Sequence, residues 1–269
     1  MRGASRASYT ELREQLTAAA RGAVTAGRVG DELFAVVGLL DNEHGLRRML
    51  ADPTKPSAEK SAVAGQLLHG KISGPTEKLV VEAVAAQWAT PGDLSDALEQ
   101  LAIEAYTISA QAGRSLDDLE DDLFRLGRLI SGQPGLRLAL IGTTSAEAKT
   151  GLLDNLLSGK VSEVSQRLIT QALTHPRGRS PQAMLELCAS IAARRREQLI
   201  AVVRVAAELS AAQRKRLSDA LTSAYGQGIH LNVVHDPAVV GGISVQIGDE
   251  LVDGTAASRL AEVQRKLAS

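Results

Sequence analysis

The chain contains 269 residues, of which 44% are hydrophobic, and its formal net charge is −1. This length and composition predict two or three folded units with ordinary cores. Aromatic residues make up only 2% of the chain, so the cores must be aliphatic, which favours packing of helices and argues against a nucleic-acid binder with aromatic stacking platforms.

The N-terminal part of the chain predicts helices separated by breaking residues. The segment Met1–Arg6 leads into a polar helix and lacks the apolar core of a signal peptide, and no apolar run in the chain approaches the roughly 18 residues of a membrane helix. A first helix is expected over residues 8–29 and a second from Asp31. Asp52–Pro56 must end the second helix, because proline lacks an amide donor and restricts the residue before it.

The sequence then repeats itself at offsets of 87 to 90 residues. The matched segments are Glu32-Leu33-Phe34 with Asp122-Leu123-Phe124, Gly45-Leu46-Arg47 with Gly135-Leu136-Arg137, Gly70-Lys71-Ile72-Ser73 with Gly159-Lys160-Val161-Ser162, and Leu98–Ala102 with Leu185–Ala189. The apolar stripe Leu33, Val36, Val37 and Leu40 has its counterpart in Leu123, Leu126, Leu129 and Ile130. We therefore expect two similar helical bundles, over residues 1–113 and 114–198.

One loop of the first repeat has the spacing of a phosphate-binding loop. Gly65 and Gly70-Lys71 fit the pattern GxxxxGK, but Ile72 stands where Ser or Thr would bind magnesium. A helix, and not a strand, is predicted before this loop. Gly70 and its counterpart Gly159 are therefore predicted to end helices, and a nucleotide-binding enzyme built around Lys71 is the weaker alternative.

No catalytic, cofactor-binding or metal site is predicted. The five histidines have no Cys or acidic partners at metal-ligand spacing. The acidic run over residues 117–122 is expected to stabilise the start of a helix, and Arg194–Arg196 the end of one. Cys188 is the one cysteine, so an internal disulfide is excluded, and its apolar helical surroundings predict a buried thiol.

The hydrophobic period changes after residue 198. Residues 199–206 and 230–235 are short and rich in β-branched residues, as strands are, and the capping box Ser210–Gln213 opens a helix between them. Ile243, Val245 and Ile247 alternate with polar or small residues and predict a half-buried strand. Residues 199–269 are thus expected to form a third unit of strand, helix, strand, hairpin and helix.

Glycine and aspartate mark the turns of the predicted hairpin. Gly241 and Gly242 stand at the strand entry, where a bulge or a close backbone crossing is expected. Gly248-Asp249 is a turn signal. Asp253-Gly254-Thr255 ends the return strand, and Leu260 belongs to the apolar stripe of a terminal helix.

This segment resembles the C-terminal part of the delta subunit of F-type ATP synthases, the oligomycin sensitivity-conferring protein family. In that family a Gly-Gly-apolar strand, a Gly-Asp turn, an apolar-Asp-Gly-Ser/Thr step and a Leu-bearing terminal helix follow one another. The matching residues are Gly241, Gly242, Ile243, Gly248, Asp249, Val252, Asp253, Gly254, Thr255 and Leu260. The first helical repeat departs from the common single-bundle form and resembles the longer actinobacterial type, in which the helical part is duplicated.

The resemblance implies a mainly α fold with a C-terminal α+β domain, and a non-catalytic stator subunit without a cofactor. It implies that a helical bundle binds the N-terminal segment of an alpha subunit and that the C-terminal unit binds the C-terminal end of the b subunit, near the motif. One copy per complex would lie at the cytoplasmic face of the cell membrane, peripherally and without contact to nucleic acid. A soluble helical adaptor with other partners is the alternative, and the resemblance leaves open which repeat binds the alpha subunit.

Overall fold

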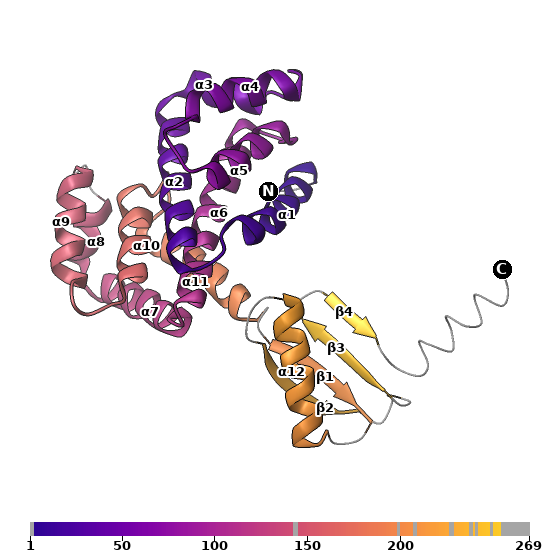
Figure 1. Ribbon diagram of the computed structural model, residues 1–269. Coiled ribbons are helices and arrows are strands. Elements are labelled where there is room, and N and C mark those ends of the chain that lie inside the picture. The colour runs from indigo at the N-terminus through magenta and orange to yellow at the C-terminus, as the bar shows by residue number, and fades with distance from the viewer. Residues whose placement is uncertain are drawn as a thin grey trace. The chain divides into compact units, whose positions relative to one another are not determined.

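Figure 1 shows the computed structural model, which describes residues 3–141, 145–197, 200–206, 209–225, 229–236, 239, 242–247 and 250–253. The chain divides into two compact units, Met1–Ala192 and Ala193–Ser269, here called the helical unit and the C-terminal unit. Within the described residues there are twelve helices and one four-stranded sheet, which belongs to the C-terminal unit. The predicted class, mainly helical with a C-terminal α+β part, is confirmed.

The elements follow one another in a simple order along the chain. The helices are α1 Ala4–Ala19, α2 Ala23–Asn42, α3 His44–Ala51, α4 Ser57–Leu68, α5 Gly74–Ala85, α6 Pro91–Ala112, α7 Leu116–Gly132, α8 Pro134–Ile141, α9 Ala146–Leu157, α10 Glu163–Thr174, α11 Pro181–Glu197 and α12 Ala211–Tyr225. The strands are β1 Ile200–Val205, β2 His230–His235, β3 Ile243–Ile247 and β4 Glu250–Asp253.

The first helix break differs from the prediction. In place of one helix over residues 8–29, α1 ends at Ala19 and α2 begins at Ala23. Gly22, just before α2, has a φ of 84°, a conformation that glycine adopts without steric cost. The prediction is wrong because both segments beside Gly22 have a helical pattern and a single glycine can also lie within a helix, so the sequence did not show the break. A break is present at Asp52–Pro56, between α3 and α4, but the helix expected to run there from Asp31 is wrong, because Asp31 lies within α2 and α2 ends at Asn42.

Helix α6 contacts both the helices that precede it in the chain and the helices that follow it. Every residue from Leu101 to Ala110 is buried. The helix packs along α2, beside which it lies in the middle of the unit (Figure 1), and it also contacts α1, α3 and α5 as well as α7 and α10. The predicted stripes of α2 and α7 face inward, since all their members are buried except Leu129, which is half-buried. Both stripes therefore contribute to the aliphatic core.

Helices α2 and α6 approach closely at Gly30. A Cβ atom added to Gly30 would lie 2.8 Å from the ring of Tyr106 and 3.3 Å from the carbonyl oxygen of Ala102. We expect Gly30→Val to separate the helices and to lower the free energy of unfolding by about 1–3 kcal/mol, measured by urea titration. In Gly38→Ala, the control on the same helix, nothing lies within 4 Å, so the change should stabilise by roughly 0.5–1 kcal/mol. Equal effects of the two changes would contradict the close crossing.

In the described part of the C-terminal unit, helix α12 packs on a mixed sheet. Its strand order is β2-β1-β3-β4, with β1 and β2 parallel and the other two pairs antiparallel. Alternate residues of β1 and β3, together with Ile229, form a buried core against which Leu217 and Leu221 of α12 pack. The predicted capping box is confirmed, because the Ser210 amide donates to Gln213 Oε1 (2.9 Å) and the Gln213 amide donates to Ser210 Oγ (3.2 Å).

Candidate functional site

The loop with the GxxxxGK spacing is a helix end, as predicted. Helix α4 ends at Leu68, Gly70 has a φ of 71°, and the Lys71 amide donates to the Leu68 carbonyl (2.9 Å). In the second half of the helical unit, α9 ends at Leu157, Gly159 has a φ of 70°, and the Lys160 amide donates to the Leu157 carbonyl (2.9 Å). Both turns satisfy carbonyl groups that the helix leaves open, and the two lysine side chains are exposed.

Two carboxylates stand at the N-termini of neighbouring helices. Glu32 on α2 accepts hydrogen bonds from the Ser73 amide (3.0 Å), from Ser73 Oγ and from Thr76 Oγ1, at the start of α5. Asp122 on α7 accepts a hydrogen bond from the Ser162 amide (3.4 Å), at the start of α10. Each carboxylate therefore satisfies an open backbone donor and complements the positive end of the helix dipole.

Substitution of Glu32 is expected to give a pH-dependent loss of stability. Burial raises the pKa of Glu32, but hydrogen bonds from Ser73, Thr76 and Arg28 outweigh burial and hold the pKa below its usual value. The stabilisation is thus present above the unfolded pKa, ordinarily 4.5, and is lost as the pH falls through the folded pKa. We expect Glu32→Gln to cost roughly 1–3 kcal/mol at pH 7 and less in acid. The control Arg28→Ala removes an exposed partner of the same carboxylate and should cost below about 0.5 kcal/mol. A loss of stability in Glu32→Gln that does not depend on pH would contradict this account.

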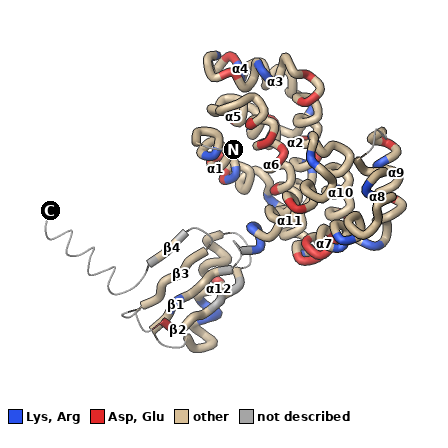
Figure 2. The backbone as a smooth tube through the Cα atoms, turned by 180° about the vertical axis from the view of Figure 1, so that it is seen from behind, with Lys and Arg blue, Asp and Glu red and all other residues tan. Residues whose placement is uncertain are grey.

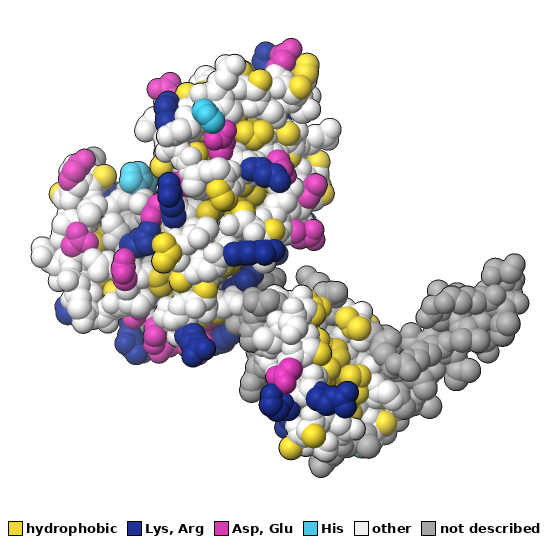
Figure 3. Space-filling view, viewed as in Figure 1, with side chains coloured by type: hydrophobic (Ala, Val, Ile, Leu, Met, Phe, Trp, Pro, Cys, Tyr) yellow, Lys and Arg dark blue, Asp and Glu magenta, His cyan; other side chains and the backbone are white. Residues whose placement is uncertain are grey.

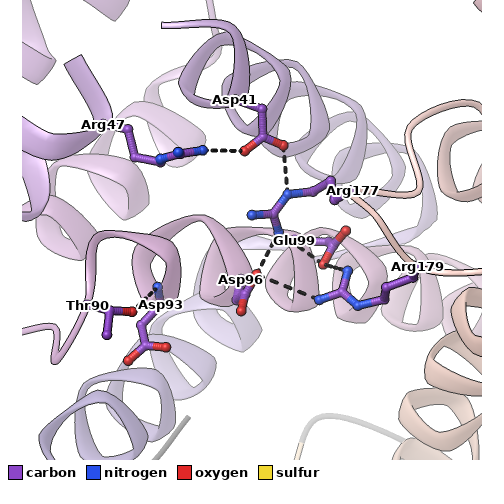
Figure 4. Close-up of polar contacts among 8 residues, drawn as sticks. All are labelled: Asp41, Arg47, Thr90, Asp93, Asp96, Glu99, Arg177 and Arg179. Carbon is purple, nitrogen blue, oxygen red and sulfur yellow. Dashed lines mark hydrogen bonds and ion pairs between the residues drawn. The ribbon is translucent and has the colours of Figure 1, made fainter. Parts of the chain in front are cut away.

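A network of arginines and carboxylates holds the loop between α10 and α11 against α2 and α6 (Figure 4). Arg177 donates to Asp41 Oδ2 (2.6 Å), to Asp96 Oδ1 (2.8 Å) and to Glu99 Oε2 (3.2 Å). Arg179 donates to the same Glu99 oxygen at 2.6 Å. Arg177 has a φ of 50°, which is uncommon for a residue with a side chain. With Arg47 on Asp41, the network contains three arginines and three carboxylates.

Glu99 is the buried centre of this network. Its side chain is 0% exposed. Burial raises the pKa of Glu99, and the neighbouring arginines Arg179 and Arg177 oppose that rise. Cys188 on α11 is also buried, as predicted, and burial raises the pKa of its thiol to about 12. Because the reactive form of cysteine is the thiolate, Cys188 is a packing residue.

A second polar cluster joins α10 to α2 and α6. Asp31 on α2 accepts hydrogen bonds from Tyr106 Oη on α6 and from Arg167 on α10. The Arg167 guanidinium lies 5.7 Å from the centroid of the Tyr106 ring. Burial, with further contributions from Asp31, raises the pKa of Tyr106 well above its usual value, so this hydroxyl acts as a donor.

Sequence reasoning missed both clusters. Residues 175–181 were predictable only as a loop, and the partners of Arg177 lie 78 to 136 residues away along the chain. No short-range pattern contains such pairs. The left-handed backbone at Arg177-Gly178 was signalled only by the glycine.

The C-terminal motif lies only partly within the described residues. Gly242 has a φ of 80°, which agrees with the special backbone predicted at the strand entry. Ile243 begins β3 and packs against the core, and Asp253 ends β4, opposite Ser244. The other motif residues lie outside the described residues, apart from Val252 on β4; they are Gly241, Gly248, Asp249, Gly254, Thr255 and Leu260.

The surface of the helical unit has no dominant charge. Figure 3 shows acidic and basic side chains interspersed over the visible face of this unit. No set of three or more His, Cys, Asp and Glu in the described ranges is placed to hold a metal ion. None of the helices that the structure describes is both long and apolar enough to span a membrane.

Comparison with known proteins decides the family. The sequence model described as ATP synthase delta (OSCP) subunit matches residues 104–267. The chain is 48% identical over 269 residues to the ATP synthase subunit delta of Thermobifida fusca, with all of both chains covered. The chain belongs to the ATP synthase delta (OSCP) subunit family. The corresponding subunits of Streptomyces griseus and Acidothermus cellulolyticus are 44% and 41% identical, again over the whole of both chains.

Family membership confirms the resemblance predicted from the C-terminal motif. A delta (OSCP) subunit is a non-catalytic stator component of the F-type ATP synthase, so a nucleotide-binding enzyme around Lys71 is excluded. The helix caps and polar clusters described above join elements within the chain and stabilise its fold.

Replacement of the exposed cap lysines should leave ATP synthesis unchanged. Lys71 contributes its amide to the end of α4, and that group is retained in Lys71→Ala. We expect the rate of ATP synthesis in membrane vesicles to stay within about twofold of that of the unchanged chain for both Lys71→Ala and Lys160→Ala. Most substitutions of exposed residues alter stability by less than about 0.5 kcal/mol. Loss of synthesis in Lys71→Ala with the subunit still assembled would show that this loop does more than end a helix.

Proposed function

We propose that this chain ties the catalytic head of the ATP synthase to its peripheral stalk. The helical unit binds the N-terminal segment of an alpha subunit as a helix in a groove, and the C-terminal unit binds the C-terminal end of the b subunit. One copy sits peripherally at the cytoplasmic face of the cell membrane. The observation that carries the proposal is identity of 48% across the whole of the Thermobifida fusca delta subunit; the division into two compact units supports the assignment of one partner to each.

A stator must resist torque without turnover of its own. Slow release requires apolar contacts at the centre of each interface with a polar rim, and the body between the interfaces must be stiff. The network of Arg177 and Arg179 with buried Glu99 supports such stiffness within the helical unit, because the loop after α10 is held to α2 and α6 by several charge-assisted hydrogen bonds.

We propose that the b-subunit contact lies near the family motif. The motif residues concerned are Gly241, Gly242, Ile243, Gly248, Asp249, Asp253, Gly254 and Leu260. The positive φ of Gly242 and the edge position of β4 support a specific backbone shape there.

We also propose that the helical unit is a duplication, with repeats over residues 1–113 and 114–198 followed by the C-terminal domain over 199–269. Matching parts support it: Glu32 and Asp122 each accept a hydrogen bond from the amide of a serine at a helix N-cap, and Gly70 and Gly159 share one conformation. Helices α5 and α10 have the same length and bury residues at the same positions. Because α6 packs against helices of both halves, and the family match begins within it at residue 104, α6 completes the first bundle and supports the second.

Purification of the tagged full chain from membranes tests the proposed function. The alpha, beta and b subunits should be recovered with it in fixed ratio, and a subunit stripped of the head should be recovered with b alone. Recovery of an unrelated pair of proteins, without alpha or b, would favour the adaptor alternative.

A further inference from the structure

Helix α7 carries an exposed phenylalanine whose counterpart in the first repeat is covered. Phe124 is 65% exposed, whereas Phe34 on α2 is 8% exposed. The two occupy matching places, because each directly follows a buried leucine, Leu33 or Leu123, in the aligned segments. The difference between them must therefore come from what lies against each helix.

The outer face of α2 is covered by α10 and the loop that follows it. Arg167 on α10 pairs with Asp31, and Arg177 after α10 pairs with Asp41. Gln171 and His175 line the same groove as Phe34. The first repeat thus shows what this kind of face binds, namely a helical segment that brings basic side chains to carboxylates on either side of the phenylalanine.

The outer face of α7 offers a matching phenylalanine, 65% exposed, and a matching carboxylate, Asp121 in the place of Asp31. Asp117, Asp121, Phe124 and Arg128 recur at spacings of four, three and four residues, so they form one stripe on the helix. The acidic start of α7 is visible in Figure 2. Asp121 has an ion pair with Arg125 at 3.5 Å, and both side chains are about 70% exposed, so water and salt weaken that pair and a partner can replace it.

The charge pattern of this stripe selects one kind of partner. Its N-terminal half is acidic, as the α2 face is at Asp31, and a basic side chain opposite Asp121 would reproduce the pairing made by Arg167. The Arg128 guanidinium lies 5.8 Å from the centroid of the Phe124 ring and holds the ring in place for an aliphatic side chain of the partner.

We propose that the stripe of Asp117, Asp121, Phe124 and Arg128 binds an amphipathic helix of another ATP synthase subunit. That helix presents an arginine or lysine to Asp121 and covers Phe124 with its next turn. The inference rests on the proposed duplication and on the proposed place of the chain in the complex. It adds a docking face to the helical unit, on α7. In the first repeat the matching face, on α2, is already occupied by α10 and the loop that follows it.

Photo-crosslinking in the assembled complex tests this directly. Phe124→p-benzoylphenylalanine is introduced into the full chain, and complexes recovered with alpha and beta subunits are irradiated and the adducts mapped by mass spectrometry. We expect an adduct to a helix of another subunit with a basic residue within one turn. Val63→p-benzoylphenylalanine, at a 38% exposed position of α4, is the control. Recovery with alpha and beta tests the proposed function separately, so an assembled chain without an adduct would refute only the α7 contact.

Charge reversal gives the second measurement. Asp121→Arg, added to the photoreactive chain, should reduce the Phe124 adduct by roughly tenfold, because like charges across an interface are strongly unfavourable; unchanged thermal unfolding should show that the fold is intact. An adduct to a second copy of this chain, or to its own C-terminal unit, would overturn the proposal. So would an adduct yield no greater than that of the Val63 control, or one that Asp121→Arg leaves unchanged.

Discussion

Removal of residues 200–269 is expected to leave a folded helical unit that still binds an alpha N-terminal peptide but no longer binds the b subunit. The helical unit has its own core, centred on α6, in which every position from Leu101 to Ala110 is buried. The deleted residues contain the four strands that the structure describes and the family motif. We expect b-subunit binding to fall by at least about 100-fold, since the central residues of an interface carry most of its energy, while alpha binding changes less than about twofold.

Titration of the truncated chain and of the full chain with each partner, the alpha N-terminal peptide and the b subunit, distinguishes the possible results. Circular dichroism and urea unfolding first establish that the truncated chain is folded. Loss of alpha binding with b binding retained would reverse the assignment of the two ends. Retention of both partners by the truncated chain would show that neither binding surface lies in the C-terminal unit.

Replacement of Arg177 should cause the largest loss of stability of any single change considered. Arg177→Ala leaves Asp41 and Asp96 with fewer partners and leaves the buried Glu99 carboxylate with Arg179 as its remaining cation. Removal of one partner of a buried ion pair costs about 3–5 kcal/mol, and we expect a loss of that size in urea titration. Arg177→Lys should recover part of it, because lysine keeps the charge but not the planar fork. Arg125→Ala, in an exposed pair, is the control and should cost below about 1 kcal/mol.

The Arg177→Ala deficit should depend on pH in a defined direction. Burial raises the pKa of Glu99 above its usual 4.5. Burial of this side chain therefore costs no stability at pH values below 4.5, where the carboxyl group is protonated, and its full cost is reached above the folded pKa, where the group is charged. Loss of Arg177 raises the pKa of Glu99 further. The deficit relative to the unchanged chain should therefore be greatest near neutral pH and shrink as the pH falls toward 4. A deficit that grows in acid would contradict the role assigned to Glu99.

Local patterns predicted much of the fold because their causes are local. The stripes of α2 and α7 follow from helical periodicity, the ends of α4 and α9 from Gly70 and Gly159, and the start of α12 from a capping box of adjacent residues. The family motif depends on consecutive residues in the same way. Each of these signals lies within about two helical turns of the structure it determines.

Contacts between residues that are distant in the chain could not be predicted in this way. Phe34 and Phe124 stand in nearly identical local sequence, yet one is 8% and the other 65% exposed, because side chains distant in the chain lie around Phe34, among them Tyr106 of α6 and Gln171 of α10. The partners of Arg177 are likewise distant in the chain. The break at Gly22 could not be predicted for a different reason, because glycine is compatible with both a helical and a left-handed backbone conformation.

ATP-driven proton pumping in membrane vesicles depleted of this subunit tests the stator role most directly. Addition of the full chain is expected to restore pumping while ATP hydrolysis by the head continues, because the head is again held against the torque of the rotor. Addition of residues 1–199 alone should leave hydrolysis uncoupled from pumping. Restoration of pumping by residues 1–199 to the level of the full chain would contradict the assignment of this protein as a two-ended link.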